Sequence, residues 1–344
     1  MTAIDRNAAE SAFGWQFQVH AAIVLALKNI EDMSSIEVEG DMEDIEIELQ
    51  NGMRVYCQAK AHYKANEPGA GSTRRLSEAM ETLVDDLRKA DCMKAVYVTN
   101  DRLLFGKRIN ADNFSDGAFY GFYELEPEQR VAVEKHIGDT VLLTKEYGLL
   151  CFFVLPFFGS DEATKTKAVD AAIAAFLGSI NSSDAHGVIP SRLRRIWVQL
   201  LGADATVKPG HPNKSISKKT FIWPIVFEMC DKASVGNGML EIDEDVLEDV
   251  MHRYRSTIDG QSDLYSVSTR IISDYEQFRC SSTSGSRTLS DFVSERWEQY
   301  VDVLGASVIC DDDERRAFVW LVLLKVLKRR SAMREVSNAV RLHD

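Results

Sequence analysis

The chain lacks the features that mark zinc-stabilised, secreted or membrane-spanning proteins. Its six cysteines are widely scattered and form no Cys-x-x-Cys pair, which argues against a structural zinc site and favours reduced thiols. The first residues carry acids and no apolar stretch of the secretory type. The longest apolar run, 317–324, is too short to span a bilayer. We therefore expect a cytoplasmic protein without membrane contact.

Positive charge is also scarce. Lys and Arg number 40 against 53 Asp and Glu, so the formal net charge is −13. A protein that binds DNA avidly usually carries clustered Lys and Arg, because these neutralise the phosphates. If this chain cuts DNA, either its basic residues are concentrated or a partner supplies the DNA contacts. The sequence contains neither a glycine-rich phosphate loop nor an internal repeat.

Apolar and polar residues alternate along 44–60, DIEIELQNGMRVYCQAK, which predicts a β-hairpin. The apolar positions are Ile45, Ile47 and Leu49 before the turn, and Val55, Cys57 and Ala59 after it. Burying both sets on one face predicts Ile45 opposite Ala59, Ile47 opposite Cys57, and Leu49 opposite Val55. That register makes 51–53 the loop, with Gly52 supplying a positive φ.

The same register places Asp44 opposite Lys60 and Glu46 opposite Gln58. Carboxylate and amide oxygens are the ligands that Mg²⁺ prefers, and a bound metal polarises a phosphate and lowers the pKa of a water. A nearby lysine can orient that water or stabilise charge that develops on the phosphate. The hairpin therefore predicts metal-dependent nuclease chemistry, with Mg²⁺ or Mn²⁺ as the cofactor.

This arrangement resembles the PD-(D/E)XK nuclease superfamily. Asp44 would be the invariant aspartate, Gln58 would replace the usual acid, and Lys60 would be the lysine of the motif. The supporting pattern, over roughly the first half of the chain, is 14–18 (GWQFQ), Glu39 and 98–100 (VTN). Within the superfamily, the chain is similar to the double-stranded-DNA endonuclease effectors of bacterial anti-phage systems, of the CBASS-associated and Lamassu types.

The resemblance implies an α/β fold with a restriction-endonuclease-like α-β-β-β-α-β core. Hydrophobic periodicity predicts the same order: a helix over 8–30, strands over 35–39 and within 44–60, a helix over 72–89 and a strand over 93–99. Further periodic segments are 127–137, 149–157 and 161–177, then helices opening at Pro190 and over 241–256, 263–278, 289–304 and 313–330. We expect a nuclease domain over 1–182 and an all-helical domain over 183–344 for partner binding, oligomerisation or regulation.

Three further residues are candidates for the site. Because the Gln58 amide is neutral, one more carboxylate would help to neutralise a metal ion, and Glu46 or Glu39 could provide it. Gln16 would support the active centre, as polar residues on the first helix do in the related nucleases. The alternative for Gln16, and for His20 one turn later, is a partly exposed helix face.

Basic residues fall in two zones that could contact DNA. Lys64, Arg74 and Arg75 lie around the start of the helix over 72–89, and Arg192 and Arg195 lie in the helix that opens at Pro190. Arginines at a helix N-terminus oppose the helix dipole, so we expect some other benefit to keep them there. Phosphate contact is one interpretation, and ordinary surface charge is the other.

The C-terminal half is too short for the nucleotide-sensing domain of the CBASS relatives. The resemblance therefore favours activation by partner proteins of a defence operon, with an SMC-like ATPase as one candidate, or by self-association into a homo-oligomer on double-stranded DNA. Two other hypotheses remain open. The nuclease module could be degenerate and only bind DNA or scaffold a complex, or the hairpin could belong to an unrelated enzyme or scaffold.

Overall fold

The computed structural model describes residues 3–39, 43–63, 72–106, 117, 119–138, 140–159, 161–180, 183–202, 215–232, 243–280 and 288–342. The chain forms two compact units. The first comprises Met1–Ile180, Ile189–Pro224 and Ala339–Asp344, and the second comprises Asn181–Val188 and Ile225–Asn338. The sequence predicts a single domain boundary near residue 182. The sheet-containing unit instead also includes two segments beyond that residue.

The first unit is built on one mixed sheet of seven strands in the order β5-β6-β4-β3-β2-β1-β7. The strands are β1 (Met33–Val38), β2 (Ile45–Leu49), β3 (Arg54–Lys60), β4 (Cys92–Thr99), β5 (Phe119–Gly121), β6 (Leu150–Val154) and β7 (Ile216–Ser217). The central strands β3, β4 and β6 run parallel, and the other pairs are antiparallel. The short edge strands β5 and β7 have no counterpart in the sequence prediction.

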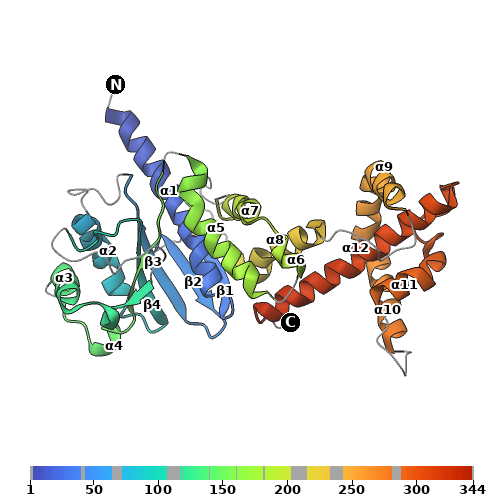
Figure 1. The fold of residues 1–344 in the computed structure, drawn as a ribbon. Coiled ribbons are helices and arrows are strands. Elements are labelled where there is room, and N and C mark those ends of the chain that lie inside the picture. Colours follow the sequence, from blue (N-terminus) through green and yellow to red (C-terminus); the bar gives the residue numbers. More distant parts are fainter. Residues whose placement is uncertain are drawn as a thin grey trace. The chain divides into compact units, whose positions relative to one another are not determined.

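Helices cover both faces of this sheet (Figure 1). α1 (Ala3–Lys28) packs on one face and α2 (Ser72–Asp86) on the other. The remaining helices of the unit are α3 (Pro127–Ile137) on α2, α5 (Glu162–Ser179) and α7 (Pro190–Gly202) on α1, and the short α4 (Thr144–Tyr147), with a 3-10 turn at Phe122–Glu124; α8 (Lys218–Lys232) spans the boundary between the units. Tyr56 of β3 packs in the α2 core, so alternation turns Val55 and Cys57 toward α1. The predicted order of helix, three strands, helix and strand is confirmed as α1-β1-β2-β3-α2-β4.

The hairpin register differs from the prediction by two residues. Ile45 pairs with Cys57 and Ile47 with Val55, where the sequence predicts Ala59 and Cys57 as partners. Leu49 N donates to Met53 O at 2.8 Å, so the loop is 50–52. Gly52, at φ 79°, therefore occupies the last loop position, which is where a three-residue hairpin loop needs a positive φ. A shift of two residues keeps every side chain on its predicted face.

The second unit is helical in its described part, as predicted. Its helices are α6 (Ser183–His186), α9 (Glu244–Asp263), α10 (Tyr265–Cys280), α11 (Leu289–Arg296) and most of α12 (Asp312–Ala339), with 3-10 turns at Trp297–Tyr300 and Ala306–Val308. The apolar run 317–324 of α12 is buried throughout and lies in the core of this unit. The acidic start of α12 acts as a cap, because Asp311 Oδ1 accepts from Glu314 N at 2.9 Å.

No helix in the described part of the chain has both the length and the apolar character needed to cross a membrane.

Candidate active site

The ion pair between Asp44 and Lys60 is the centre of the candidate site. Asp44 directly precedes β2 and Lys60 ends β3. One oxygen, Asp44 Oδ2, accepts hydrogen bonds from Lys60 Nζ at 3.1 Å and from Ala59 N at 2.8 Å. The side chains are 16% and 31% exposed, so the pair is largely withdrawn from water but reachable by a ligand. The sequence predicts this contact. In the observed register Asp44 does not lie directly opposite Lys60, so its side chain extends along β3 to reach it.

Gln58 lies beside this pair but bonds to Glu43, a residue to which the sequence analysis gives no role. Its amide Nε2 donates to a carboxylate oxygen of Glu43, and both residues are buried. Burial raises the pKa of Glu43 to about 8, and a hydrogen bond with the Asp86 carboxyl contributes to the rise. Glu43 therefore holds its proton near neutral pH.

Asp86 brings a second buried carboxyl to the site from the last turn of α2. It is 1% exposed, and its Oδ1 lies 2.6 Å from Lys89 Nζ. An acid in the last turn of a helix opposes the dipole. That placement, three residues before Lys89, is the sequence signal that could have drawn attention to Asp86.

Glu46 and Glu39 lie elsewhere than the sequence predicts. Glu46 is opposite Tyr56, not Gln58, because of the register shift, and its Oε2 lies 3.5 Å from Arg54 Nη1. Burial raises the pKa of Glu46, although Arg54 opposes the rise. Glu39 has an exposed side chain and a positive φ of 55°, and its backbone N donates to Asp44 O at 2.9 Å. Glu39 thus shapes the turn that presents Asp44.

Gln16 contacts a lysine of α5 instead of the Asp44–Lys60 pair. Its Oε1 accepts from Lys165 Nζ at 3.1 Å, and Lys165 also lies 3.0 Å from Glu162. His20 is 3% exposed, so the expectation of an exposed stripe holds for Gln16 but is wrong for His20. Its ring packs on Phe157 with centroids 4.9 Å apart, and burial lowers its pKa.

The chain that leaves β3 is fixed by Asn100. Asn100 is fully buried at the end of β4, where its Oδ1 accepts from His62 N at 2.8 Å and its Nδ2 donates to His62 O at 2.9 Å. A further bond from Nδ2 reaches Phe157 O at 3.0 Å. Nearby, Ser72 Oγ at the start of α2 donates to Asp101. These bonds hold the ends of β3 and β4 and the start of α2 together, which limits the freedom of Lys60.

The first zone of candidate DNA contacts borders α2. Lys64 lies outside the described residues. The side chain of Arg74 is 82% exposed and its Nε lies 2.8 Å from Glu78 Oε1, one turn along the helix. Arg75 is half-buried. Arg74 is therefore placed on the surface with a local partner that DNA would have to compete for.

The second zone lies on α7 and contains both exposed and buried arginines. Arg192 and Arg195 are exposed, and Arg195 Nε donates to Ser191 O at 3.4 Å. Arg194, between them, is buried and bonds to Asp170 at 2.8 Å and to Glu162 at 3.2 Å. The helix thus uses one arginine for packing and presents two at the surface.

The site offers oxygen ligands for a hard cation, but few of them. In the described ranges, no group of three or more His, Cys, Asp and Glu side chains is arranged to hold a metal. Asp44 Oδ1 and Gln58 Oε1 have no hydrogen-bond partner among the described residues. Mg²⁺ typically binds through one or two carboxylates and keeps several waters or substrate phosphates. The donor set therefore fits a magnesium ion that the substrate helps to hold.

Comparisons of the chain with protein-family models, with curated proteins and with solved structures gave no match.

Proposed function

We propose that this chain is a divalent-metal-dependent endonuclease that hydrolyses phosphodiester bonds of double-stranded DNA, as the effector of a bacterial anti-phage defence system. The observation that carries the proposal is the 3.1 Å contact between Asp44 Oδ2 and Lys60 Nζ beside Gln58. The order α1-β1-β2-β3-α2-β4 supports a restriction-endonuclease-like core in the first unit.

Asp44 Oδ1 and Gln58 Oε1 would hold Mg²⁺ or Mn²⁺ next to the scissile phosphate. The metal, when bound, would polarise the phosphate and lower the pKa of a bound water. Lys60 would donate hydrogen bonds to a phosphate oxygen or to the attacking water. Since Asp44 shares one oxygen with Lys60, the same pair would position both the cation and the nucleophile.

Glu43 takes the role that the sequence analysis gives to Glu46 or Glu39. It lies next to Gln58 and is protonated near neutral pH because of burial and Asp86. A cation at Gln58 would favour the charged form of Glu43, because opposite charge lowers the pKa of a carboxyl. Loss of that proton would add the negative charge that the neutral Gln58 amide does not supply.

The charge of the chain indicates that DNA engagement depends on other subunits. With a net charge of −13, the isolated chain would be repelled by DNA at long range. Exposed Arg74, Arg192 and Arg195 are the basic contacts we propose for the phosphate backbone. Proteins of the same defence operon, such as an SMC-like ATPase, or further copies of this chain would supply the remaining positive charge.

Plasmid cleavage tests the proposal directly. The purified chain, alone and with partners encoded by neighbouring genes, is incubated with supercoiled plasmid and Mg²⁺ or Mn²⁺. Asp44→Asn and Lys60→Ala should each reduce the cleavage rate by about 10² to 10³, because each removes a group that acts on the reacting phosphate. Glu48→Gln changes an exposed carboxylate of β2 and should cleave as the wild type does. Undiminished cleavage by both site variants, at unchanged melting temperature, would refute the site.

A second function is favoured by the same geometry. Asp44 is already neutralised by Lys60, and in the described ranges no three-residue metal cluster occurs. The module could therefore bind DNA or scaffold a complex without cutting. Saturable DNA binding without cleavage, in Mg²⁺ and Mn²⁺ and with every partner present, would establish this function in place of the first.

A further inference from the structure

A cleft opens on the α1 face of the sheet, near the strand ends opposite to Lys60. Its volume is about 260 Å³. Leu25 of α1, Val55 of β3, Val96 of β4 and Phe119 of β5 form its apolar lining, and Lys28 and Lys94 carry its charges. Gln58 and Lys60 point to the other face, because they share the parity of Tyr56. The cleft is therefore separate from the candidate active site.

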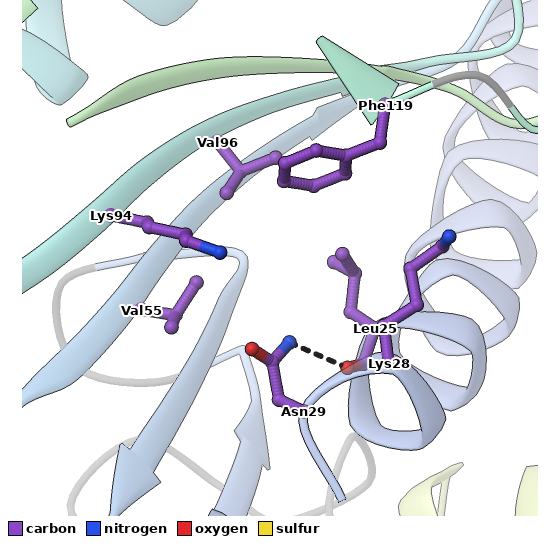
Figure 2. Close-up of a pocket in the computed structure, with 7 residues that line it drawn as sticks. All are labelled: Leu25, Lys28, Asn29, Val55, Lys94, Val96 and Phe119. Carbon is purple, nitrogen blue, oxygen red and sulfur yellow. Dashed lines mark hydrogen bonds between the residues drawn. The ribbon is translucent and has the colours of Figure 1, made fainter. Parts of the chain in front are cut away.

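Phe119, which lines the cleft, and its neighbour Phe153 of β6 each lie close to one of the two ammonium groups. The Phe119 and Phe153 rings have centroids 6.0 Å apart. Lys94 Nζ lies 5.6 Å from the centre of Phe119, and Lys28 Nζ lies 5.5 Å from the centre of Phe153. Figure 2 shows Lys94 and Lys28 on opposite sides of the open space, with the Phe119 ring along a third side. Cation–π attraction to the rings helps to position the two ammonium groups.

Among the residues that the structure describes, neither lysine has a carboxylate partner. Lys28 has a structural reason for its place, because it lies in the last turn of α1, where a cation favours the helix dipole. Lys94 has no such reason: it is half-buried and shares the face of the buried Val96. A charge in this apolar setting is costly unless an anion satisfies it.

The positive charge of the cleft contrasts with the net negative charge of the whole chain. The chain carries 13 more acidic than basic side chains, yet the two charges that line this cleft are both positive. A narrow cleft with apolar walls strengthens the field of the charges that line it. The local potential thus attracts anions, while the apolar lining rewards a hydrophobic body.

We propose that the cleft binds a small organic monoanion with a single ring or a short apolar chain, of the aryl-carboxylate type. The carboxylate would lie between Lys28 and Lys94, and the ring would pack on Phe119 and Val55. The volume, about 260 Å³, lies just below the range of drug-sized ligand pockets, which favours a ligand with one ring over a larger one. This binding activity does not depend on the proposed nuclease function.

A fluorine NMR titration of the full chain tests the site. The probe is 4-fluorophenylacetate, and its neutral counterpart is 2-(4-fluorophenyl)ethanol, which has the same ring and no charge. We expect saturable binding of the acid, with the alcohol at least about tenfold weaker, because a charge-assisted contact is lost. Inorganic phosphate, which has charge without a ring, should not displace the acid at equal concentration.

Variants of the chain assign the binding to the two lysines. Lys94→Met and Lys28→Met keep most of the side-chain length and remove the charge, so each should weaken binding of the acid about tenfold or more. Lys94→Arg keeps the charge and should retain binding. Lys167→Met, at an exposed position of α5, is the matched control and should change nothing.

Three results would overturn the proposal. Absence of saturable binding up to about 10 mM acid would mean that no site exists in the useful affinity range. Equal affinity for the alcohol, with no effect of Lys94→Met, would identify an apolar cleft without anion selectivity. Displacement by phosphate at equal concentration would identify a general anion site.

Discussion

Lys60 and Lys94 lie on neighbouring parallel strands of one sheet, yet their surroundings differ. The Lys60 ammonium is 3.1 Å from a carboxylate, whereas the Lys94 ammonium lies near an aromatic ring and lines the cleft. The two residues point to opposite faces, toward α2 and toward α1. The candidate active site is therefore rich in carboxyl groups, whereas the charged residues that line the cleft are both lysines.

The comparison separates two uses of a lysine. Where the charge is already matched, as at Lys60, the protein fixes the position of the ammonium, which suits a role in positioning a reacting group. Where it is unmatched, as at Lys94, the protein leaves a favourable interaction for a ligand to complete. The acids of the first site and the cations of the second can each be altered to test this distinction.

The largest effect should come from Glu43, whose pKa is raised from 4.5 to about 8. The folded chain therefore holds a proton that the unfolded chain has released above pH 4.5. The contribution of Glu43 to stability should be complete below about pH 4.5 and should fall as pH rises from there to about 8. Each tenfold fall in proton concentration within that range costs about 1.4 kcal/mol, so the loss between about pH 5 and pH 7 is about 3 kcal/mol. Glu43→Gln should abolish most of it.

Thermal unfolding from pH 5 to pH 9 measures this effect. The control is Glu48→Gln, which alters an exposed carboxylate on the same hairpin and should leave the pH profile unchanged. The informative quantity is the difference between wild type and Glu43→Gln, because other titrating groups cancel in it. A difference that stays constant with pH would show that Glu43 is charged in the folded state, and the contrast between the two sites would weaken.

The hairpin shows what an alternating pattern can and cannot predict. Alternation fixes the face of each residue, so Ile45, Ile47 and their partners are buried as predicted. It does not distinguish registers that differ by two residues. The register depends on the loop position of Gly52, and a three-residue loop places such a glycine last. Counting from Gly52 would have given the observed pairing.

The residues that form the candidate site show a second limit of prediction from the sequence. Asp44 and Lys60 lie on adjoining segments, so their contact follows from the hairpin alone. Asp86 reaches the site only because α2 crosses the sheet, and no local pattern gives the angle of that crossing. Lys94 could have been found, since it has the same strand parity as the buried Val96 and interrupts an apolar face.

A smaller effect, of about 1 kcal/mol, should distinguish the two lysines in stability. Lys60→Met leaves the partly buried Asp44 without its ammonium, so it should destabilise the fold by about 1 kcal/mol. Lys94→Met removes a half-buried charge that has no ion pair in the described residues, so it should leave stability unchanged or raise it slightly. Urea unfolding at pH 7 measures both. Equal destabilisation by the two variants would contradict the contrast.

The smallest effect on stability is expected for Arg195→Ala, a change that should affect DNA binding but not the fold. Arg195 is exposed on α7 and makes only a long bond to Ser191 O at 3.4 Å, so Arg195→Ala should change the unfolding free energy by less than about 0.5 kcal/mol. If Arg195 contacts a phosphate, the variant should weaken DNA binding and reduce the salt dependence of the binding constant by about one counterion. The control is Gln199→Ala, which changes an exposed residue of the same helix, one turn after Arg195. An unchanged salt dependence would assign Arg195 to ordinary surface charge, and the contacts of this chain with DNA would then have to come from Arg74 and Arg192.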